Sequence, residues 1–225
     1  MHFEILVEDQ SGKKALDLLV PKIVGAEADF RVIAYKGIGH LPKGLKPGSD
    51  AKKRILLDQI PRLLRGHGKT FAGYPPDYPA AVIVVCDLDK RNLKEFRAEL
   101  LAVLEACQTR PETRFCFAIE EGEAWLLGDI PAIRSAYPQA KKEVLHRYQN
   151  DSIGNTWERL ADAAVYPGGS SALAAKGWSG IGAAKSQWAA KICPHMDVEN
   201  NASPSFVYFR DRLRELAKRQ GRVDG

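Results

Sequence analysis

The chain has 225 residues, a formal net charge of +5 and 45% hydrophobic residues. These values suit one α/β domain with added elements, and they exclude a collagen-like or disordered chain. The small basic excess is compatible with a polyanionic partner but is also common in proteins that bind none. No run of about 18 uncharged apolar residues occurs, so we expect no membrane span. The first four residues lack the basic and apolar regions of a signal peptide.

The cysteines favour a reducing environment. Cys86, Cys107, Cys116 and Cys193 include no pair at the two-residue spacing of zinc and redox sites. Cys86 and Cys116 lie within apolar runs, where a thiol is a small core side chain. We therefore expect a cytoplasmic protein.

The first half of the chain alternates predicted strands and helices. Apolar periodicity predicts strands at 2–7, 30–35, 80–86 and 114–119, and helices at 11–24, 50–64, 93–107 and from 120 onward. Loops are expected at 36–50 and 66–79, which are rich in glycine or proline. The segment 80–86 is continuously apolar, as in a parallel strand covered on both faces. This order predicts an α/β fold with a mostly parallel sheet and helices on both faces.

The second half is less regular and predominantly helical. We expect helices at about 131–148, 155–165, 183–192 and 204–220, with a glycine- and serine-rich segment at 166–182. The organisation predicted from this pattern is an α/β core at 1–130 and a helical C-terminal extension at 131–225 packed on it.

Acidic residues follow three of the predicted strands. The carboxylates concerned are Glu8, Asp87, Asp89, Glu120, Glu121 and Glu123. The carboxyl ends of parallel strands lie at one edge of a sheet, where ligands bind. Gathered carboxylates repel one another, and a hard divalent cation such as Mg²⁺ offsets this repulsion. Each residue alone could instead be a helix cap or a turn former.

The spacing of Asp87 and Asp89 adds to the metal hypothesis. On an extended segment, side chains two residues apart point the same way, so both carboxylates could reach one ion. One or two such ions can polarise a phosphoryl group and activate a water molecule. We expect Mg²⁺ or Mn²⁺ as the cofactor.

Two pairs of segments carry a family resemblance. The segments 5–12 and 84–89 resemble the Toprim pattern, in which a strand ends in Glu and a later strand ends in Asp-x-Asp. The segments 119–129 and 195–206 resemble a closer group, an uncharacterised bacterial Toprim-like family often encoded beside ABC-type ATPases and related to the overcoming-lysogenisation-defect nucleases. Many Toprim proteins have glycine directly after the motif Glu, whereas this chain has Asp9 and Gln10.

The resemblance implies a Toprim-like Rossmannoid core and a nuclease acting on DNA or RNA. It also implies a role in phage defence with an ABC-type ATPase partner. Glu8, Asp87 and Asp89 would hold the metal, one of Glu120, Glu121 and Glu123 would complete its shell, and Glu8 could act as general acid or base. The alternatives are a non-catalytic effector that binds nucleic acid or nucleotide under the control of an ATPase, and a primase-like nucleotidyl transferase.

Basic residues near these motifs are candidates for phosphate contact. Lys90 and Arg91 follow Asp89 directly and are expected to contact a nucleic-acid backbone. The segment 180–186 predicts either a phosphate-binding helix start containing Lys185 or a plain glycine loop. Lys185 could also stabilise charge on a transferring phosphoryl group. Of the four tryptophans, Trp178 beside Gly177 is the one most suited to an exposed stacking position.

Overall fold

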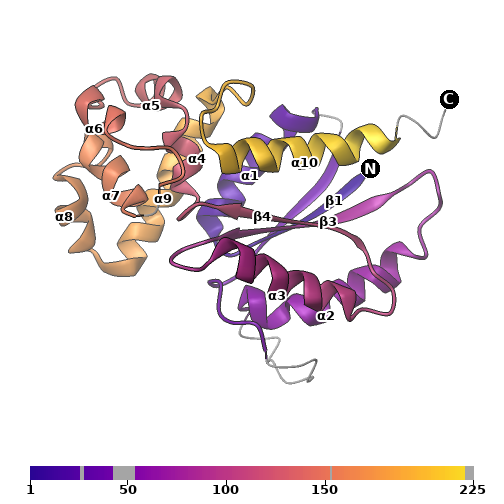
Figure 1. The fold of residues 1–225 in the computed structure, drawn as a ribbon. Helices are drawn as coiled ribbons and strands as arrows, with labels where there is room; N and C mark the ends of the chain where they lie inside the picture. The colour runs from indigo at the N-terminus through magenta and orange to yellow at the C-terminus, as the bar shows by residue number, and fades with distance from the viewer. Residues whose placement is uncertain (26–27, 43–53, 153, 221–225) are drawn as a thin grey trace.

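Four strands form one parallel sheet in the computed structural model, which describes residues 1–25, 28–42, 54–152 and 154–220 (Figure 1). The strands follow the order β2-β1-β3-β4, so the first and third strands are central. Their bounds are β1 (His2–Val7), β2 (Asp29–Ala34), β3 (Ala80–Asp87) and β4 (Glu112–Ala118). The predicted α/β class and parallel sheet are confirmed.

Alternating side chains of the central strands serve two separate cores. In β1, Ile5 packs in one hydrophobic cluster and Leu6 in the other. In β3, Ile83 and Val84 divide in the same way. Both faces of the sheet are therefore buried, which explains why β3 is apolar throughout rather than alternating.

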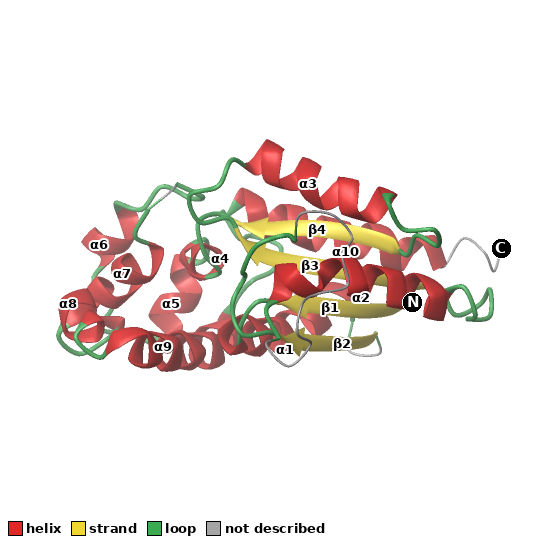
Figure 2. Ribbon diagram, turned by 90° about the horizontal axis from the view of Figure 1, so that it is seen from below, coloured by secondary structure: helices red, strands yellow, loops and turns green. Residues whose placement is uncertain are grey.

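Helices cover both faces of the sheet (Figure 2). The side chains of α1 (Gln10–Val24) and α10 (Pro204–Gln220) belong to the cluster on one face. Those of α2 (Leu56–Phe71) and α3 (Leu93–Glu105) belong to the cluster on the other. The sheet is thus the middle layer of three.

The segment 123–195, called here the helical lobe, lies beyond the carboxyl ends of the strands (Figures 1 and 2). Its long helix α9 packs along α1. The lobe contains α4 (Glu123–Leu127), α5 (Ile130–Ala136), α6 (Lys142–His146), α7 (Thr156–Leu160), the π-helical turn η2 (Ala161–Val165), α8 (Gly169–Ala174), α9 (Gly177–Ile192) and the 3-10 turn η3 (Cys193–His195).

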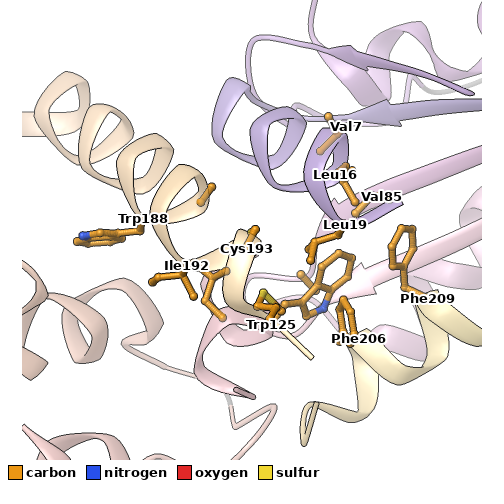
Figure 3. Close-up of a cluster of buried hydrophobic side chains, with 14 of the residues drawn as sticks. Val7, Leu16, Leu19, Val85, Trp125, Trp188, Ile192, Cys193, Phe206 and Phe209 are labelled. Atoms are coloured by element: carbon orange, nitrogen blue, oxygen red, sulfur yellow. The ribbon is translucent and has the colours of Figure 1, made fainter. Parts of the chain in front are cut away.

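One aromatic group joins the lobe to the sheet. The ring of Trp125 stacks on Phe209 with centroids 4.9 Å apart and meets Phe206 edge-on at 5.7 Å (Figure 3). Its Nε1 donates to Ser205 Oγ at 3.0 Å. The same hydrophobic cluster includes residues of β1 and of α9. A buried core therefore attaches the lobe to the edge of the sheet that carries the acidic residues. The domain boundary expected at residue 130 stays a prediction.

Three helices occupy segments expected to lack regular structure. Helix α2 continues to Phe71 although it contains Pro61 and Gly68, α8 covers Gly169–Ala174, and α9 begins at Gly177. Helix α2 packs closely against Thr109 at Gly68, where a Cβ would lie 1.9 Å from the Thr109 carbonyl oxygen. This close packing requires glycine and explains its presence inside the helix. The expected start of the second helix at Asp50 lies outside the described residues.

No helix in the described part of the chain is both long enough and apolar enough to cross a membrane.

Candidate functional site

The structure brings Glu8 and Asp87 together at the carboxyl edge of the sheet. Glu8 directly follows β1, and Asp87 is the last residue of β3, which pairs with β1 in parallel. Asp87 is close enough to influence Glu8, because hydrogen bonding from its side chain and backbone lowers the pKa of Glu8. Two adjacent strands thus present two interacting carboxyl groups at one edge.

The surroundings of this pair favour one bound proton. Burial raises the pKa of Glu8 to about 7; the charges of Asp9 and Asp89 act in the same direction, while the hydrogen bonds to Asp87 act against it. Burial and the charge of Glu8 raise the pKa of Asp87 well above its ordinary value. Two such close carboxyl groups resist joint ionisation.

Glu8 also carries an unsatisfied atom. Its Oε2 is buried and has no hydrogen-bond partner among the described residues. A buried oxygen without a partner costs free energy, so a native structure that keeps one calls for an explanation such as a bound water or ion.

Lys185 supplies a positive charge beside the acidic pair. It lies on α9, and its Nζ is 2.9 Å from Glu121 Oε2 and 2.9 Å from Glu123 Oε2. Burial opposes the charged form of Lys185, but the charges of Glu123, Glu121 and Asp87 outweigh it and raise its pKa. Lys185 is therefore a fixed ammonium group that links the helical lobe to the acidic edge.

A small cavity of about 40 Å³ lies among these groups. A water molecule needs roughly 10–15 Å³ by this measure, so the space suits a few waters or a small hydrated ion. The polar side chains that line the cavity are Glu8, Asp9, Ser11, Asp87, Glu123 and Lys185.

Asp9 has a structural role at this edge. Its carboxylate accepts hydrogen bonds from Gly12 N and Ser11 Oγ, both at 2.7 Å, and it is the N-cap of α1. The residue that stands after the motif Glu therefore caps the helix. Gly12 lies so close to Val7 that a Cβ there would be 2.6 Å from its Cγ2.

Asp89 does not continue the strand. Its φ is +50°, in the left-handed region, and its backbone N–H donates to the Glu120 carbonyl oxygen at 2.9 Å. The expectation that Asp87 and Asp89 extend side by side on a straight segment is therefore wrong, because β3 ends at Asp87 and the chain turns. The charge of Asp89 still reaches Glu8. Its role as a metal ligand stays a prediction.

The three glutamates after β4 divide between the start of α7 and Lys185. Glu120 accepts from the backbone N–H groups of Asn155 and Thr156 at 3.3 and 3.1 Å, at the start of α7. Glu121 accepts from Thr156 Oγ1 at 3.3 Å as well as from Lys185. Glu123 is buried, burial raises its pKa, and Lys185 opposes this rise. Of the three, Glu123 is the one whose side chain lines the cavity.

The basic residues after Asp89 lie outside the cavity lining. Lys90 is exposed. Arg91 donates through Nη2 to the Gly39 carbonyl oxygen at 3.0 Å and lies over the Phe96 ring at 4.7 Å. Its Nη1 is buried and has no partner in the part of the chain that the structure describes. Their predicted contact with a nucleic-acid backbone stays a prediction.

The glycine turn at 180–182 is not a helix start. Helix α9 begins at Gly177, so these residues lie inside it and their amides are not at its amino end. The expected phosphate-binding amides at this position are therefore absent.

Trp178 is 84% exposed, whereas Trp125 and Trp188 are buried, in agreement with the expectation for the tryptophans.

Within the described residues, no three His, Cys, Asp or Glu side chains are already arranged around a common point as metal ligands. The reason is visible in the contacts: Lys185 holds Glu121 and Glu123, and Glu120 faces α7. Glu8 and Asp87 nevertheless offer the oxygen donors that a hard cation prefers, and one of these oxygens lacks a partner.

A comparison with protein families shows the family of this chain. A family model described as a domain of unknown function, DUF4276, matches residues 7–214. No curated protein and no solved structure matches the chain. The match begins at Val7, the last residue of β1, and spans the other three strands, the helical lobe and most of α10.

Proposed function

Since the chain belongs to the DUF4276 family, whose description assigns no activity, we propose a function from the site itself: a Mg²⁺- or Mn²⁺-dependent nuclease that cleaves phosphodiester bonds of DNA or RNA. The observation that carries the proposal is the Glu8–Asp87 pair, with the unsatisfied Glu8 Oε2 beside a small polar cavity. The earlier resemblance to Toprim nucleases points in the same direction.

A divalent cation suits this pair for an electrostatic reason. Folding places two carboxyl groups where both cannot ionise freely, and a cation would replace the shared proton. Glu8 and Asp87 would hold the ion, with Glu123 or Asp89 as further donors. The bound ion would polarise the phosphoryl group and stabilise the charge that develops on it.

The chain's own groups would assist in two ways. Lys185 keeps an ammonium group at the cavity, where it would stabilise negative charge on a phosphoryl oxygen. Burial raises the pKa of the Glu8 carboxyl to about 7 in the metal-free protein, so Glu8 would act as general acid or base in an arrangement where Asp87, with Glu123 or Asp89, holds the ion instead. Lys90 is exposed and would contact a phosphate outside the cavity.

One observation favours a second candidate, a non-catalytic effector. Lys185 already pairs with Glu121 and Glu123 without any metal and balances one of their two charges. In this case the protein would bind nucleic acid or nucleotide under the control of a partner ATPase, and the acidic pair would be inert. An ABC-type ATPase partner and a role in phage defence belong to both candidates and rest on the resemblance alone.

The test is a cleavage panel with the full chain. Plasmid, single-stranded DNA and tRNA are incubated with Mg²⁺ or Mn²⁺, in parallel with Asp87→Asn. We expect cleavage by the wild type that depends on the metal. We expect the variant to lose at least about 100-fold, because the metal's contribution to such reactions is worth several kcal/mol.

Two controls make the result interpretable. Glu99→Gln removes an exposed carboxylate from α3 and should cleave as the wild type does. Metal binding is measured separately, as the rise in melting temperature that Mg²⁺ produces. A wild type that binds Mg²⁺ and nucleic acid but cleaves nothing supports the effector. Cleavage that persists in Asp87→Asn, or a wild type that neither binds the metal nor cleaves, refutes the nuclease.

A further inference from the structure

A basic groove lies at the opposite edge of the sheet from Glu8 and Asp87. It has a volume of about 560 Å³. It is formed by the carboxyl half of α2 and by the loop that leads from α3 into the amino end of β4. Its lining residues are Arg62, Arg65, Gly66, Lys69, Ala106, Gln108 and Thr109. We propose that this groove binds a phosphate-bearing ligand through Arg62, Arg65 and Lys69.

The three cations form one row. Their spacing of three and four residues places them on the same face of α2, over about 10 Å along the helix axis. Every charged residue that lines the groove is basic. A ligand with two or more phosphates matches a row of this length and sign.

Hydrogen bonds to uncharged acceptors position the two arginines of the groove without neutralising their charge. Arg62 Nε donates to Gln59 Oε1 at 3.0 Å, and Arg65 Nε donates to the Pro61 carbonyl oxygen at 3.0 Å. Both acceptors are uncharged. The bonds therefore hold the side chains along α2 while the positive charge stays available to an anion.

Gly66 is the second, independent observation. A glycine inside a helix costs stability relative to alanine, so its presence calls for a reason. Gly68 has one, since a Cβ there would collide with Thr109. Gly66 has no such reason within the described chain, because a Cβ there would meet nothing within 4 Å. The position lines the groove, where the absence of a side chain lets a ligand approach the backbone between Arg62 and Lys69.

The electrostatic field next to the groove is also positive. Cys107 is buried, and burial raises the pKa of its thiol, while the positive charges of Arg65 and Arg110 oppose the rise. Arg110 therefore adds a fourth cation near the groove. The lining contains no aromatic side chain on which a base could stack, so recognition would depend on phosphate charge and not on base identity.

The experiment compares the full chain with Arg62→Gln/Lys69→Gln. Both residues are exposed, and glutamine keeps a flexible stem and a good helix propensity. The probes are inorganic tripolyphosphate, ATP and a fluorescent single-stranded oligonucleotide. We expect the double variant to bind the preferred probe at least about tenfold more weakly. The reason is that one charge-assisted hydrogen bond contributes about tenfold or more to the affinity.

The probes distinguish two sources of phosphate. Tight binding of tripolyphosphate and ATP, with little affinity for the oligonucleotide, identifies a free oligophosphate. Binding of the oligonucleotide with a logarithmic salt slope that falls by about 1.4 in the double variant identifies a strand backbone, since each phosphate contact contributes about 0.7.

Two further variants test the site itself. Lys141→Gln/Lys142→Gln removes the same charge from exposed positions at the start of α6 and should bind as the wild type does. Gly66→Gln should lose binding while its melting temperature stays equal or rises, a combination that misfolding cannot produce. The proposal is overturned if the wild type binds none of the probes, if Gly66→Gln binds normally, or if the α6 variant loses as much as the groove variant. None of these outcomes depends on the acidic site, so the nuclease proposal can fail without affecting this one.

Discussion

Replacing Glu8 by glutamine should stabilise the metal-free protein at neutral and alkaline pH. Glu8 is largely buried against Asp87 and within reach of the charges of Asp9 and Asp89. Ionised Glu8 is therefore unfavourable in the folded state, and glutamine has nearly the same shape without the charge. A substitution at the centre of the proposed catalytic site would thus increase the free energy of unfolding.

The magnitude follows from the pKa. Folding raises the pKa of Glu8 from 4.5 to about 7. At about 1.36 kcal/mol per unit, the shift corresponds to at most about 3 kcal/mol. Because the folded-state pKa is raised, the contribution of Glu8 to stability is fully present below about pH 4.5 and is lost as the pH rises to about 7. The variant should therefore gain nothing on the wild type at low pH and its full advantage above pH 7.

The assay is urea denaturation of wild type and Glu8→Gln across this pH range in a chelator. It is repeated with Mg²⁺, with Glu99→Gln as an exposed control. In the chelator, the two unfolding curves should separate progressively above about pH 4.5. With Mg²⁺, the order should reverse or the gap should close, because only the wild type retains both carboxylates for the ion. A Glu8→Gln protein that is less stable than the wild type at about pH 8 in the chelator would refute the electrostatic argument.

Two other substitutions test the structure around the sites. Lys185→Gln should destabilise the protein by about 3 kcal/mol, because it leaves Glu121 and Glu123 without their buried cation. In urea denaturation, adding Glu123→Gln should recover part of this loss. Fully additive effects of the two substitutions would contradict the coupling between these residues. Gly68→Ala should cost about 1–3 kcal/mol, since its Cβ would lie 1.9 Å from the Thr109 carbonyl oxygen. Gly66→Ala should instead increase the stability by up to about 1 kcal/mol, because the added Cβ would meet no atom within 4 Å. Equal melting temperatures for the two alanine variants would show that the loop after α3 does not pack closely against α2.

The sheet was predictable because its signals are local. Runs such as 80–86 are apolar enough to specify a strand buried on both faces, and the alternation with helices specifies a parallel order. Parallel pairing then forces the strand ends to one edge, so the meeting of Glu8 and Asp87 follows from two short motifs. Nothing beyond the strand pattern was needed for that part of the site.

The rest of the site depends on long-range contacts. Asp89 has a left-handed backbone conformation just after β3 and does not continue the strand. Glu120 accepts a hydrogen bond from the amino end of α7, about 35 residues later. Helices α8 and α9 form across glycines because tertiary packing overrides propensity. One signal was nevertheless available: Lys185 lies among the apolar positions of its helix with Ile181 and Trp188, and a lysine on such a stripe needs a carboxylate partner.

The charges at the acidic edge suggest how a cation would enter. The side chains of Glu8, Asp87, Glu121 and Glu123 carry four negative charges when all are ionised, and Lys185 balances one of them. If Glu8 and Asp87 also share a proton, two negative charges remain, and exchange of this proton for a divalent ion leaves a single negative charge. A cation can therefore bind without moving Lys185 if it takes its oxygens from the Glu8–Asp87 pair. The proton would then leave as the ion arrives, so the same raised pKa that destabilises the empty pair would set the pH at which the ion binds.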